Sequence, residues 1–377
     1  MPETVPPDLL DLRSRIQSFL AALPDVGNDD VPADLAEEVR ARSREAALFT
    51  LLQPRSLGGD EAGPLARVVA WEALAAANSP YAHFVFGPRP GIVARAEGPL
   101  RDRLLPAVLA GEKRGSFAFT EPSGPDAPPR PTWARRDGDD LLVTGRKSYV
   151  SGGATADFYG VLVNVDPEGD RPAGPAMLVI EAGTPGVTMD RRFSSLDGGH
   201  HVSLVFEEAR VPAANVIGRV GDGMRGALGN ITDERLELSA TSCGIAMWTT
   251  EFVTAHVTAT HPSGNRLGDR EGVRLRYSDL RIETYAARAM LYRTARMVES
   301  GADAMNEIMA TKVFTCEAVN RIVDTAVQLV GGNALISGHP LEKLYRRVRS
   351  LRLAGGATDV LRLNIARGRI EFESGTL

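Results

Sequence analysis

The chain has 377 residues, of which 43% are hydrophobic and 24% charged, and its net charge is −5. This is the composition of an ordinary globular protein, and the scattered Lys and Arg residues give no reason to expect a nucleic-acid partner. No apolar run approaches the roughly 20 residues that span a bilayer. The N-terminal stretch MPETVPPDLLDLRSRI lacks a signal-peptide pattern, so we expect a cytoplasmic protein without a membrane partner.

Residues 8–112 have a helical pattern. Leu9, Leu12, Ile16 and Leu20 recur at helical spacing, and the later run VVAWEALAAANS is rich in Ala. Pro and Gly pairs separate these segments. We predict an N-terminal helical domain over residues 1–113.

Residues 116–218 have a different character, because short β-type runs alternate with clusters of Asp, Gly and Pro. The runs are GSFAFTE, DLLVTGRKSYVSG, DFYGVLVNV, PAMLVIEAG, GVTMDRRF and HVSLVFEEARVP. This pattern predicts an antiparallel β-barrel domain over residues 114–220.

The remainder of the chain is helical again, in four segments. They are ITDERLELSATSCGIAMWTTEFVTAHV, RYSDLRIETYAARAMLYRTARMVES, NEIMATKVFTCEAVNRIVDTAVQLV and ATDVLRLNIARGRIEF. They predict a C-terminal four-helix bundle over residues 221–377 and an α+β fold class. Cys243 and Cys316 fall inside these helices, and the six histidines form no H-x-x-x-H pair. We therefore predict neither a disulfide nor a metal site.

Two stretches of the β region carry candidate chemistry. FAFTEPSGPD, residues 117–126, leaves a strand for a turn whose hydroxyls and N–H groups can bind a polar ring edge or an anion. GRKSYVSGG, residues 145–153, places Tyr149 and Ser151 on one face of a strand, as an aromatic platform beside a donor. From composition alone, an ordinary turn and an ordinary hairpin are the simpler interpretations.

Four motifs, taken together, resemble the acyl-CoA dehydrogenase family. LLPAVLAGEKRGSFAFTEPSGPD is similar to the family segment that ends in TEP-x-x-GSD, and GRKSYVSGGATADF to G-x-K-x-[WF]-I-[TS]-N-G. FEEARVPAANVIG and QLVGGNALISGHPLEKLYRRVR resemble F-x-x-V-x-VP-x-x-N and Q-x-x-GG-x-G followed by P-x-E. The four stand in family order with family spacing. The resemblance implies the three-part dehydrogenase fold and FAD as cofactor.

The resemblance also implies which residues meet FAD. Phe119 and Thr120 would face the pyrimidine side of the flavin, Tyr149 would pack on the isoalloxazine, and Ser151 would hydrogen-bond near N5. Further implied contacts to FAD, largely that of a neighbouring subunit, are Gln328, Gly331, Gly332 and Thr358. Consecutive glycines let a backbone approach a phosphate, although a helix C-cap explains the same glycines. Ser123 would contact the arm of the acyl carrier.

The implied reaction removes a proton from Cα and a hydride from Cβ of an acyl thioester, usually with a carboxylate base and donors to the thioester oxygen. Many members carry the base as a Glu where this chain has Gly355, so Gly355 offers only an N–H to the oxyanion. Isovaleryl- and long-chain-type members carry Glu before Arg on the first C-terminal helix. Asp233-Glu234-Arg235-Leu236 resembles that segment. We predict Glu234 as the base and Arg235 as a substrate contact.

The helical periodicity is compatible with this assignment. At about 100° per residue, Ile231, Leu238 and Ile245 form an apolar stripe and Glu234 lies about 60° to one side of it. A boundary Glu paired with Arg is the alternative interpretation. Glu237 and Asp359 are weaker candidates for the base.

The predicted function is FAD-dependent α,β-dehydrogenation of an acyl-CoA or an acyl carrier protein, with secondary metabolism as a possible setting. Electrons would pass to a flavoprotein or oxygen, and the enzyme would be a homodimer or homotetramer. A flavin monooxygenase of the same fold is one alternative. The other is a non-catalytic partner subunit of a heteromeric dehydrogenase. It is motivated by Gly355 and by Thr260, Ser263 and Glu271, which stand at FAD-holding positions of the family.

Overall fold

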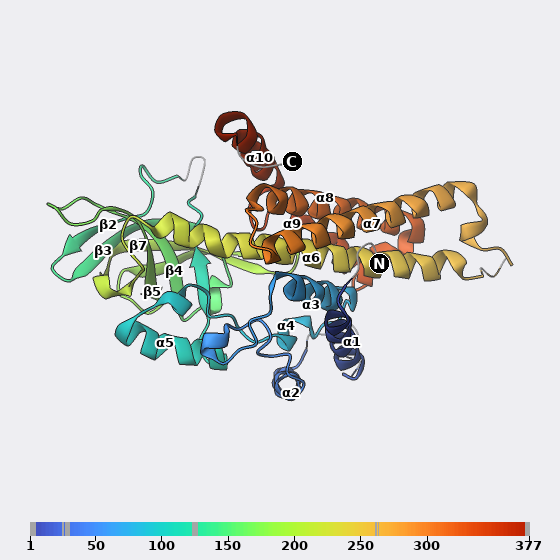
Figure 1. Cartoon of the computed structure of the whole chain (residues 1–377), viewed down its shortest axis with the longest axis horizontal. Coiled ribbons are helices and arrows are strands. Elements are labelled where there is room, and N and C mark those ends of the chain that lie inside the picture. Colours follow the sequence, from blue (N-terminus) through green and yellow to red (C-terminus); the bar gives the residue numbers. More distant parts are fainter. Residues whose placement is uncertain are drawn as a thin grey trace. The chain divides into compact units, whose positions relative to one another are not determined.

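The computed structural model describes residues 5–24, 26, 31–122, 127–260, 262 and 264–373, without the side chains of residues 226 and 228–230. The chain forms two compact units (Figure 1). One consists of Met1–Gly87 and Thr232–Leu377, and the other of Pro88–Ile231. The three predicted domains, with boundaries after residues 113 and 220, remain a proposal.

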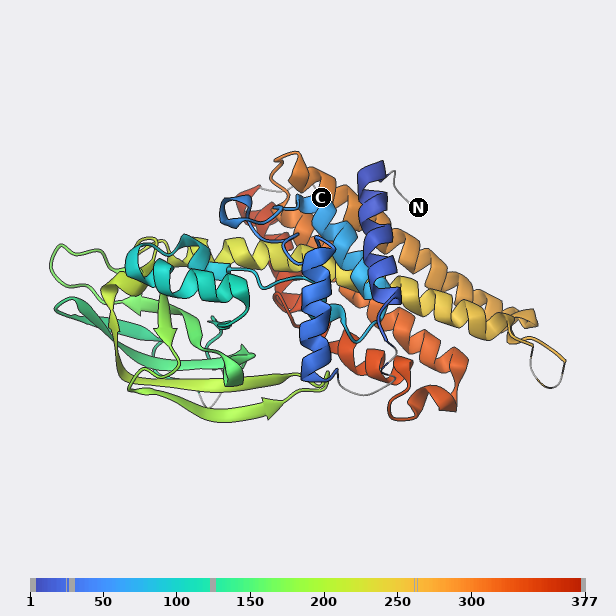
Figure 2. The same ribbon diagram turned by 90° about the horizontal axis from the view of Figure 1, so that it is seen from below.

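The first unit is helical, and its long helices run beside one another in both ribbon views (Figures 1 and 2). The predicted apolar spacing of the first helix is confirmed, since Leu12, Ile16 and Leu20 are its buried residues. The helices are α1 Pro7–Ala21, α2 Ala33–Glu45, α3 Pro64–Ala76, α4 Ala82–Val85, α6 Gly223–Thr258 (which begins in the second unit), α7 Glu271–Glu299, α8 Met305–Val330, α9 Pro340–Leu351 and α10 Thr358–Phe372.

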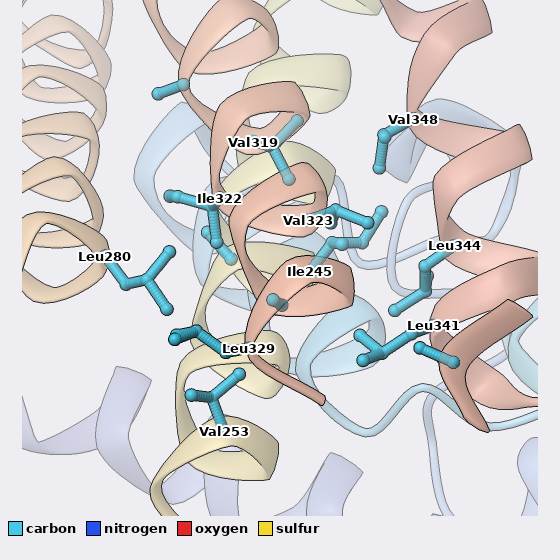
Figure 3. Packing of buried hydrophobic residues seen from close by; sticks show 14 of the residues in the cluster. Ile245, Val253, Leu280, Val319, Ile322, Val323, Leu329, Leu341, Leu344 and Val348 are labelled. Atoms are coloured by element: carbon cyan, nitrogen blue, oxygen red, sulfur yellow. The ribbon is translucent and has the colours of Figure 1, made fainter. Parts of the chain in front are cut away.

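The core of the C-terminal part joins α6, α7, α8 and α9 (Figure 3). Its labelled side chains point toward one another: Ile245, Val253, Leu280, Val319, Ile322, Val323, Leu329, Leu341, Leu344 and Val348. Helix α9 was not among the predicted segments, because its charged residues mask a narrow apolar stripe. The fourth helix of this core is therefore α9. In α10 the buried residues are Thr358 and Leu361.

The second unit is a sheet accompanied by α5 (Gly98–Ala110). The strands are β1 Gly115–Ala118, β2 Trp133–Asp137, β3 Asp140–Ser151, β4 Phe158–Val165, β5 Gly174–Glu181, β6 Val187–Ser194, β7 His200–Pro212 and β8 Val216–Ile217. Their order is β6-β7-β3-β2-β4-β5-β8, and β1 pairs with β4. Six strands match the predicted runs, whereas β2 and β8 were not predicted.

The predicted antiparallel pairing holds for the other strand pairs of the sheet, whereas β1 and β2 both pair in parallel with β4. The cause is the order of the strands. Strand β3 runs antiparallel to β2, and the chain reverses once more before β4. Strand β4 therefore runs in the direction of β2, beside which it lies, and the sheet is mixed. Helical regions with a mixed sheet still confirm the α+β class.

Among the described residues, no helix is long and apolar enough to cross a membrane. Within the same residues, no cluster of His, Cys, Asp and Glu could hold a metal ion. Cys243 and Cys316 are free, buried thiols on α6 and α8.

Candidate active site

The two predicted stretches of the β region lie side by side. The Ser148 N–H donates to the carbonyl oxygen of Thr120 at 2.9 Å. The Lys147 ammonium donates to the carbonyl oxygen of Phe119 at 3.1 Å. The segment that leaves β1 is thus bonded to the C-terminal half of β3, which brings Phe119 and Thr120 next to Tyr149.

An ion pair between a buried lysine and a half-buried glutamate supports this junction. The Lys147 side chain is 1% exposed and pairs with Glu121. Burial lowers the pKa of Lys147, and the hydrogen bond and charge of Glu121 oppose that shift. Glu121 also accepts from the N–H and the hydroxyl of Thr132, both at 3.1 Å. Lys147 and Glu121 are not among the predicted site residues, although both belong to the motifs quoted above.

The surface beside this junction presents an aromatic ring and hydroxyl groups. Tyr149 is 64% exposed, and its ring meets Phe193 edge-on at a centroid distance of 4.8 Å. The exposed Ser151 has its Oγ 3.0 Å from Nδ1 of His201. Sequence analysis missed Phe193 and His201, because their positions beside Tyr149 and Ser151 depend on strand pairing.

We call Phe119, Thr120, Tyr149 and Ser151 the strand-end patch. An accessible aromatic ring suits the face of a flat heterocycle. Hydroxyl and backbone groups beside it suit the polar edge of an isoalloxazine. The donor set of the strand-end patch therefore fits a flavin. Ser123, the predicted carrier contact, lies outside the described residues.

Arg235, the predicted substrate contact, and Gly355, the predicted oxyanion donor, meet at one turn of the first unit. Arg235 on α6 donates through Nε to the carbonyl oxygen of Gly355 at 2.9 Å. Lys312 on α8 donates to the next carbonyl oxygen, that of Gly356, at 2.8 Å. Two cations from two helices thus hold consecutive carbonyls of the turn before α10. Lys312 is not among the site residues predicted from the sequence.

The turn can adopt this shape because it contains two glycines. Gly355 has φ +63° and Gly356 has φ +101°, which lie in the region that disfavours other residues. A Cβ atom at residue 355 would lie 2.9 Å from Cδ1 of Leu238 and 3.5 Å from Cγ of Arg235. A side chain at this position would therefore be directed at the turn of α6 that follows Glu234.

Glu234 is an exposed carboxylate beside two buried cations. Burial lowers the pKa of Arg235, and the Glu234 charge opposes that shift. Burial also lowers the pKa of Lys312, where Glu234 is again among the opposing charges. Of the weaker candidates, Glu237 is buried, whereas Asp359 is 90% exposed and pairs with Arg362 at 2.9 Å.

The remaining predicted FAD contacts fall at two other places in the first unit. The buried Thr358 donates from its hydroxyl to Glu317 at 2.9 Å. Gln328, Gly331 and Gly332 are exposed at the C-terminal end of α8. At a rise of 1.5 Å per residue, Gln328 lies about 24 Å along α8 from Lys312. This exposed glycine pair lies far from the Gly355 turn. Its position is compatible with the predicted contact to the FAD of a neighbouring subunit.

Comparisons with known proteins identify the family of this chain. The family model "Acyl-CoA dehydrogenase, middle domain" matches residues 116–209, and "Acyl-CoA dehydrogenase, C-terminal domain" matches residues 221–370. Mitochondrial isobutyryl-CoA dehydrogenase of Dictyostelium discoideum is 30% identical over 271 residues, which cover 71% of this chain and 65% of that protein.

Two solved structures have the same fold. A putative acyl-CoA dehydrogenase of Mycobacterium abscessus has a TM-score of 0.86 at 22% identity, over 99% of this chain and 100% of its own. The prolyl acyl carrier protein oxidase AnaB has a TM-score of 0.80 at 21% identity, over 97% and 99%.

These matches confirm the predicted resemblance and the class of enzyme, an oxidoreductase. The family depends on FAD, which confirms the predicted cofactor, and its members act on acyl thioesters and use electron-transferring flavoproteins. Four collinear motifs, the mixed sheet with its helical units, and both family models agree that this chain belongs to the acyl-CoA dehydrogenase family.

Proposed function

We propose that this chain catalyses α,β-dehydrogenation of an acyl thioester and that Glu234 removes the α-proton. FAD, when bound, supplies the acceptor for the β-hydride. The Gly355 N–H would donate to the thioester oxygen, where negative charge develops as the proton leaves. The observation that carries the proposal is the bond from Arg235, the neighbour of Glu234, to the Gly355 carbonyl at 2.9 Å.

The crowding at Gly355 supports Glu234 over a base at residue 355. The resemblance implies that many family members carry the base at that position. Here a Cβ atom there would approach Leu238 to 2.9 Å at φ +63°, so a Glu would strain the turn. Glu234 presents an exposed carboxylate on the neighbouring helix, one residue before the Arg235 that bonds to the turn.

The substrate class is a further part of the proposal. Relatives with this fold are named for a CoA thioester, as in isobutyryl-CoA dehydrogenase, and for a carrier protein, as in prolyl acyl carrier protein oxidase. We propose an acyl-CoA or acyl carrier protein substrate of specialised metabolism. We also propose a flavoprotein or oxygen as acceptor, a homodimer or homotetramer, and a cytoplasmic location.

The test is the anaerobic reduction of bound FAD by a panel of acyl-CoA and acyl carrier protein substrates, followed by loss of visible absorbance. A general base contributes about 10²–10⁴-fold, so Glu234→Gln should slow reduction by that factor. Asp233→Asn is the matched control, because Asp233 is the preceding residue and forms a 2.8 Å ion pair with Arg67. Undiminished reduction in Glu234→Gln would refute the assignment, and Glu237→Gln would then be the next variant.

The same purified protein and substrates distinguish the dehydrogenase from the two alternative functions. A protein that is colourless and takes up no FAD would be a non-catalytic partner subunit. Oxygen-dependent turnover with a supplied reductant, and no reaction with acyl thioesters, would identify a monooxygenase. Reduction by an acyl thioester without oxygen supports the dehydrogenase.

A further inference from the structure

Three side chains form a row across neighbouring strands of the second unit. In the pairing register, Ser151 of β3 lies opposite His201 of β7, and His201 lies opposite Phe193 of β6. The Ser151 Oγ is 3.0 Å from Nδ1 of His201. Phe193 at the other end contacts the Tyr149 ring. His201 therefore contacts the Ser151 hydroxyl of the strand-end patch, and the reaction proposed above gives His201 no role.

We propose that His201 is a positioning residue that sets whether the Ser151 hydroxyl donates or accepts a hydrogen bond on its other side. The inference rests on the proposed function in one respect, namely that Ser151 faces the flavin near N5. It adds a residue and a dependence on pH that the proposed function does not contain.

The physical basis is the donor and acceptor capacity of the two groups. A serine hydroxyl has one hydrogen to donate, and a neutral imidazole nitrogen without hydrogen is an acceptor. With Nδ1 unprotonated, Ser151 donates to His201 and presents only lone pairs to its other neighbour. With His201 protonated, Nδ1–H donates to Ser151, and the hydroxyl hydrogen becomes available to that neighbour.

The two hydrogen-bonding states of Ser151 match the oxidised and reduced forms of the flavin. Flavin N5 is a hydrogen-bond acceptor when oxidised and a donor when reduced. Protonated His201 would therefore let Ser151 donate to the oxidised ring, and neutral His201 with its hydrogen on Nε2 would let Ser151 accept from the reduced ring. Histidine side chains commonly change charge between about pH 5 and pH 8, so pH is the variable that tests this arrangement.

The charged groups near His201 lie on the strands on either side of it. It is half-buried, and η4 (Gly153–Thr155), which contacts β7, carries no ionisable side chain. On β6, the Arg191 guanidinium lies over the Phe193 ring at 4.8 Å, and Asp190 pairs with Arg146 of β3 at 3.5 Å. Among residues 146–151 of β3, 190–194 of β6 and 200–204 of β7, the other ionisable side chains are Arg146, Lys147, Tyr149, Asp190, Arg191, Arg192 and His200.

The test records the visible absorption spectrum of FAD bound to the whole chain between about pH 5 and pH 8. We expect a one-proton transition in the flavin bands of the unaltered protein. His201→Asn keeps an amide that can bond to Ser151 but cannot titrate, so it should bind FAD and lose the transition. Ser151→Ala should lose it as well. His200→Asn, a change at the adjacent exposed histidine, should retain it.

Three results would overturn the role proposed for His201. A bound, substrate-reducible flavin whose spectrum shows no transition in this range would overturn the inference and leave the proposed function intact. A transition that survives in Ser151→Ala or His201→Asn would also overturn it, because the effect would not pass through this pair. A chain that binds no FAD would overturn both the inference and the proposed function.

Discussion

Arg235 on α6 donates through Nε to the carbonyl oxygen of Gly355, 120 residues further along the chain, at 2.9 Å. The bond joins the first helix of the C-terminal part to the turn before α10. Lys312 adds a second bond to the next carbonyl of that turn. Because hydrogen bonds to charged groups are worth about 1.5–3 kcal/mol each, the two cations make this turn a fixed feature beside Glu234.

Gly355→Ala should destabilise the protein through both backbone strain and crowding. A left-handed conformation costs a non-glycine residue about 1–2 kcal/mol, and the new Cβ would meet Leu238 at 2.9 Å. We expect a loss of about 2–4 kcal/mol in the free energy of unfolding, measured in urea. Gly301→Ala is the matched control, because Gly301 has φ +78° but open space around it.

Leu238→Ala tests the crowding separately. If the new methyl group at residue 355 clashes with the Leu238 side chain, the variant with both changes should lose less free energy of unfolding than the sum of the losses in Gly355→Ala and Leu238→Ala. Equal costs at residues 355 and 301 would contradict the crowding and leave only backbone strain.

Lys312→Met should change how stability depends on pH. Burial lowers the pKa of Lys312 in the folded protein, whereas an unfolded lysine titrates near about 10.4. Between these two values the unfolded chain binds more protons, so stability rises with pH. The stabilising contribution is complete above about pH 10.4 and is lost as pH falls through the folded value.

The measurement is the free energy of unfolding of both proteins from neutral pH to about pH 10.4. The difference between the unaltered protein and Lys312→Met should move in favour of the unaltered protein as pH rises. Lys343→Met, at an exposed lysine on α9, is the control. Parallel pH profiles for the unaltered protein and Lys312→Met would contradict the prediction.

Glu72→Gln should break a buried polar cluster that joins α1, α3 and α7. The fully buried Glu72 accepts from Arg13 at 2.9 Å, from Arg288 at 2.7 Å and from the Tyr292 hydroxyl at 2.7 Å. Loss of its charge leaves two arginines with a weaker partner, and breaking a buried pair costs about 3–5 kcal/mol.

Urea unfolding of Glu72→Gln measures this loss. Glu371→Gln, which removes the charge from an exposed pair with Arg367 at 2.8 Å, should cost about 0–1 kcal/mol. Similar costs for the two variants would show that the Glu72 cluster contributes no more than a surface ion pair.

Lys147→Met should weaken FAD binding without preventing folding of the helical unit. The change removes the bonds from Lys147 to Phe119 and Glu121 that hold the strand-end patch together. A loss of about 1.5–3 kcal/mol corresponds to roughly 10- to 150-fold in the dissociation constant. Titration of the deflavinated protein with FAD, followed by flavin fluorescence, measures it. Lys113→Met in the same unit is the control, and equal affinity in both variants would contradict the role of Lys147.

The secondary structure was predictable where the pattern was strong. Helices α1, α6, α7 and α8 follow long apolar repeats, and six strands follow β-branched runs between turn residues. Strand β2, with the sequence WARRD, was missed because it is short and mostly charged. Its parallel pairing with β4 depends on the path of the chain between them, which local propensity does not encode.

Several residues of the candidate site were predictable from the sequence, whereas most of their contacts were not. The sequence by itself determined the family, the FAD cofactor, the absence of a carboxylate at residue 355 and the carboxylate at residue 234, since these follow from residue identity and order. Only the tertiary structure decided that Arg235 holds Gly355, that Lys147 joins Phe119 to β3 and that His201 touches Ser151. These pairs are 120, 28 and 50 residues apart. Such contacts arise from helix packing and strand register, which the whole fold sets.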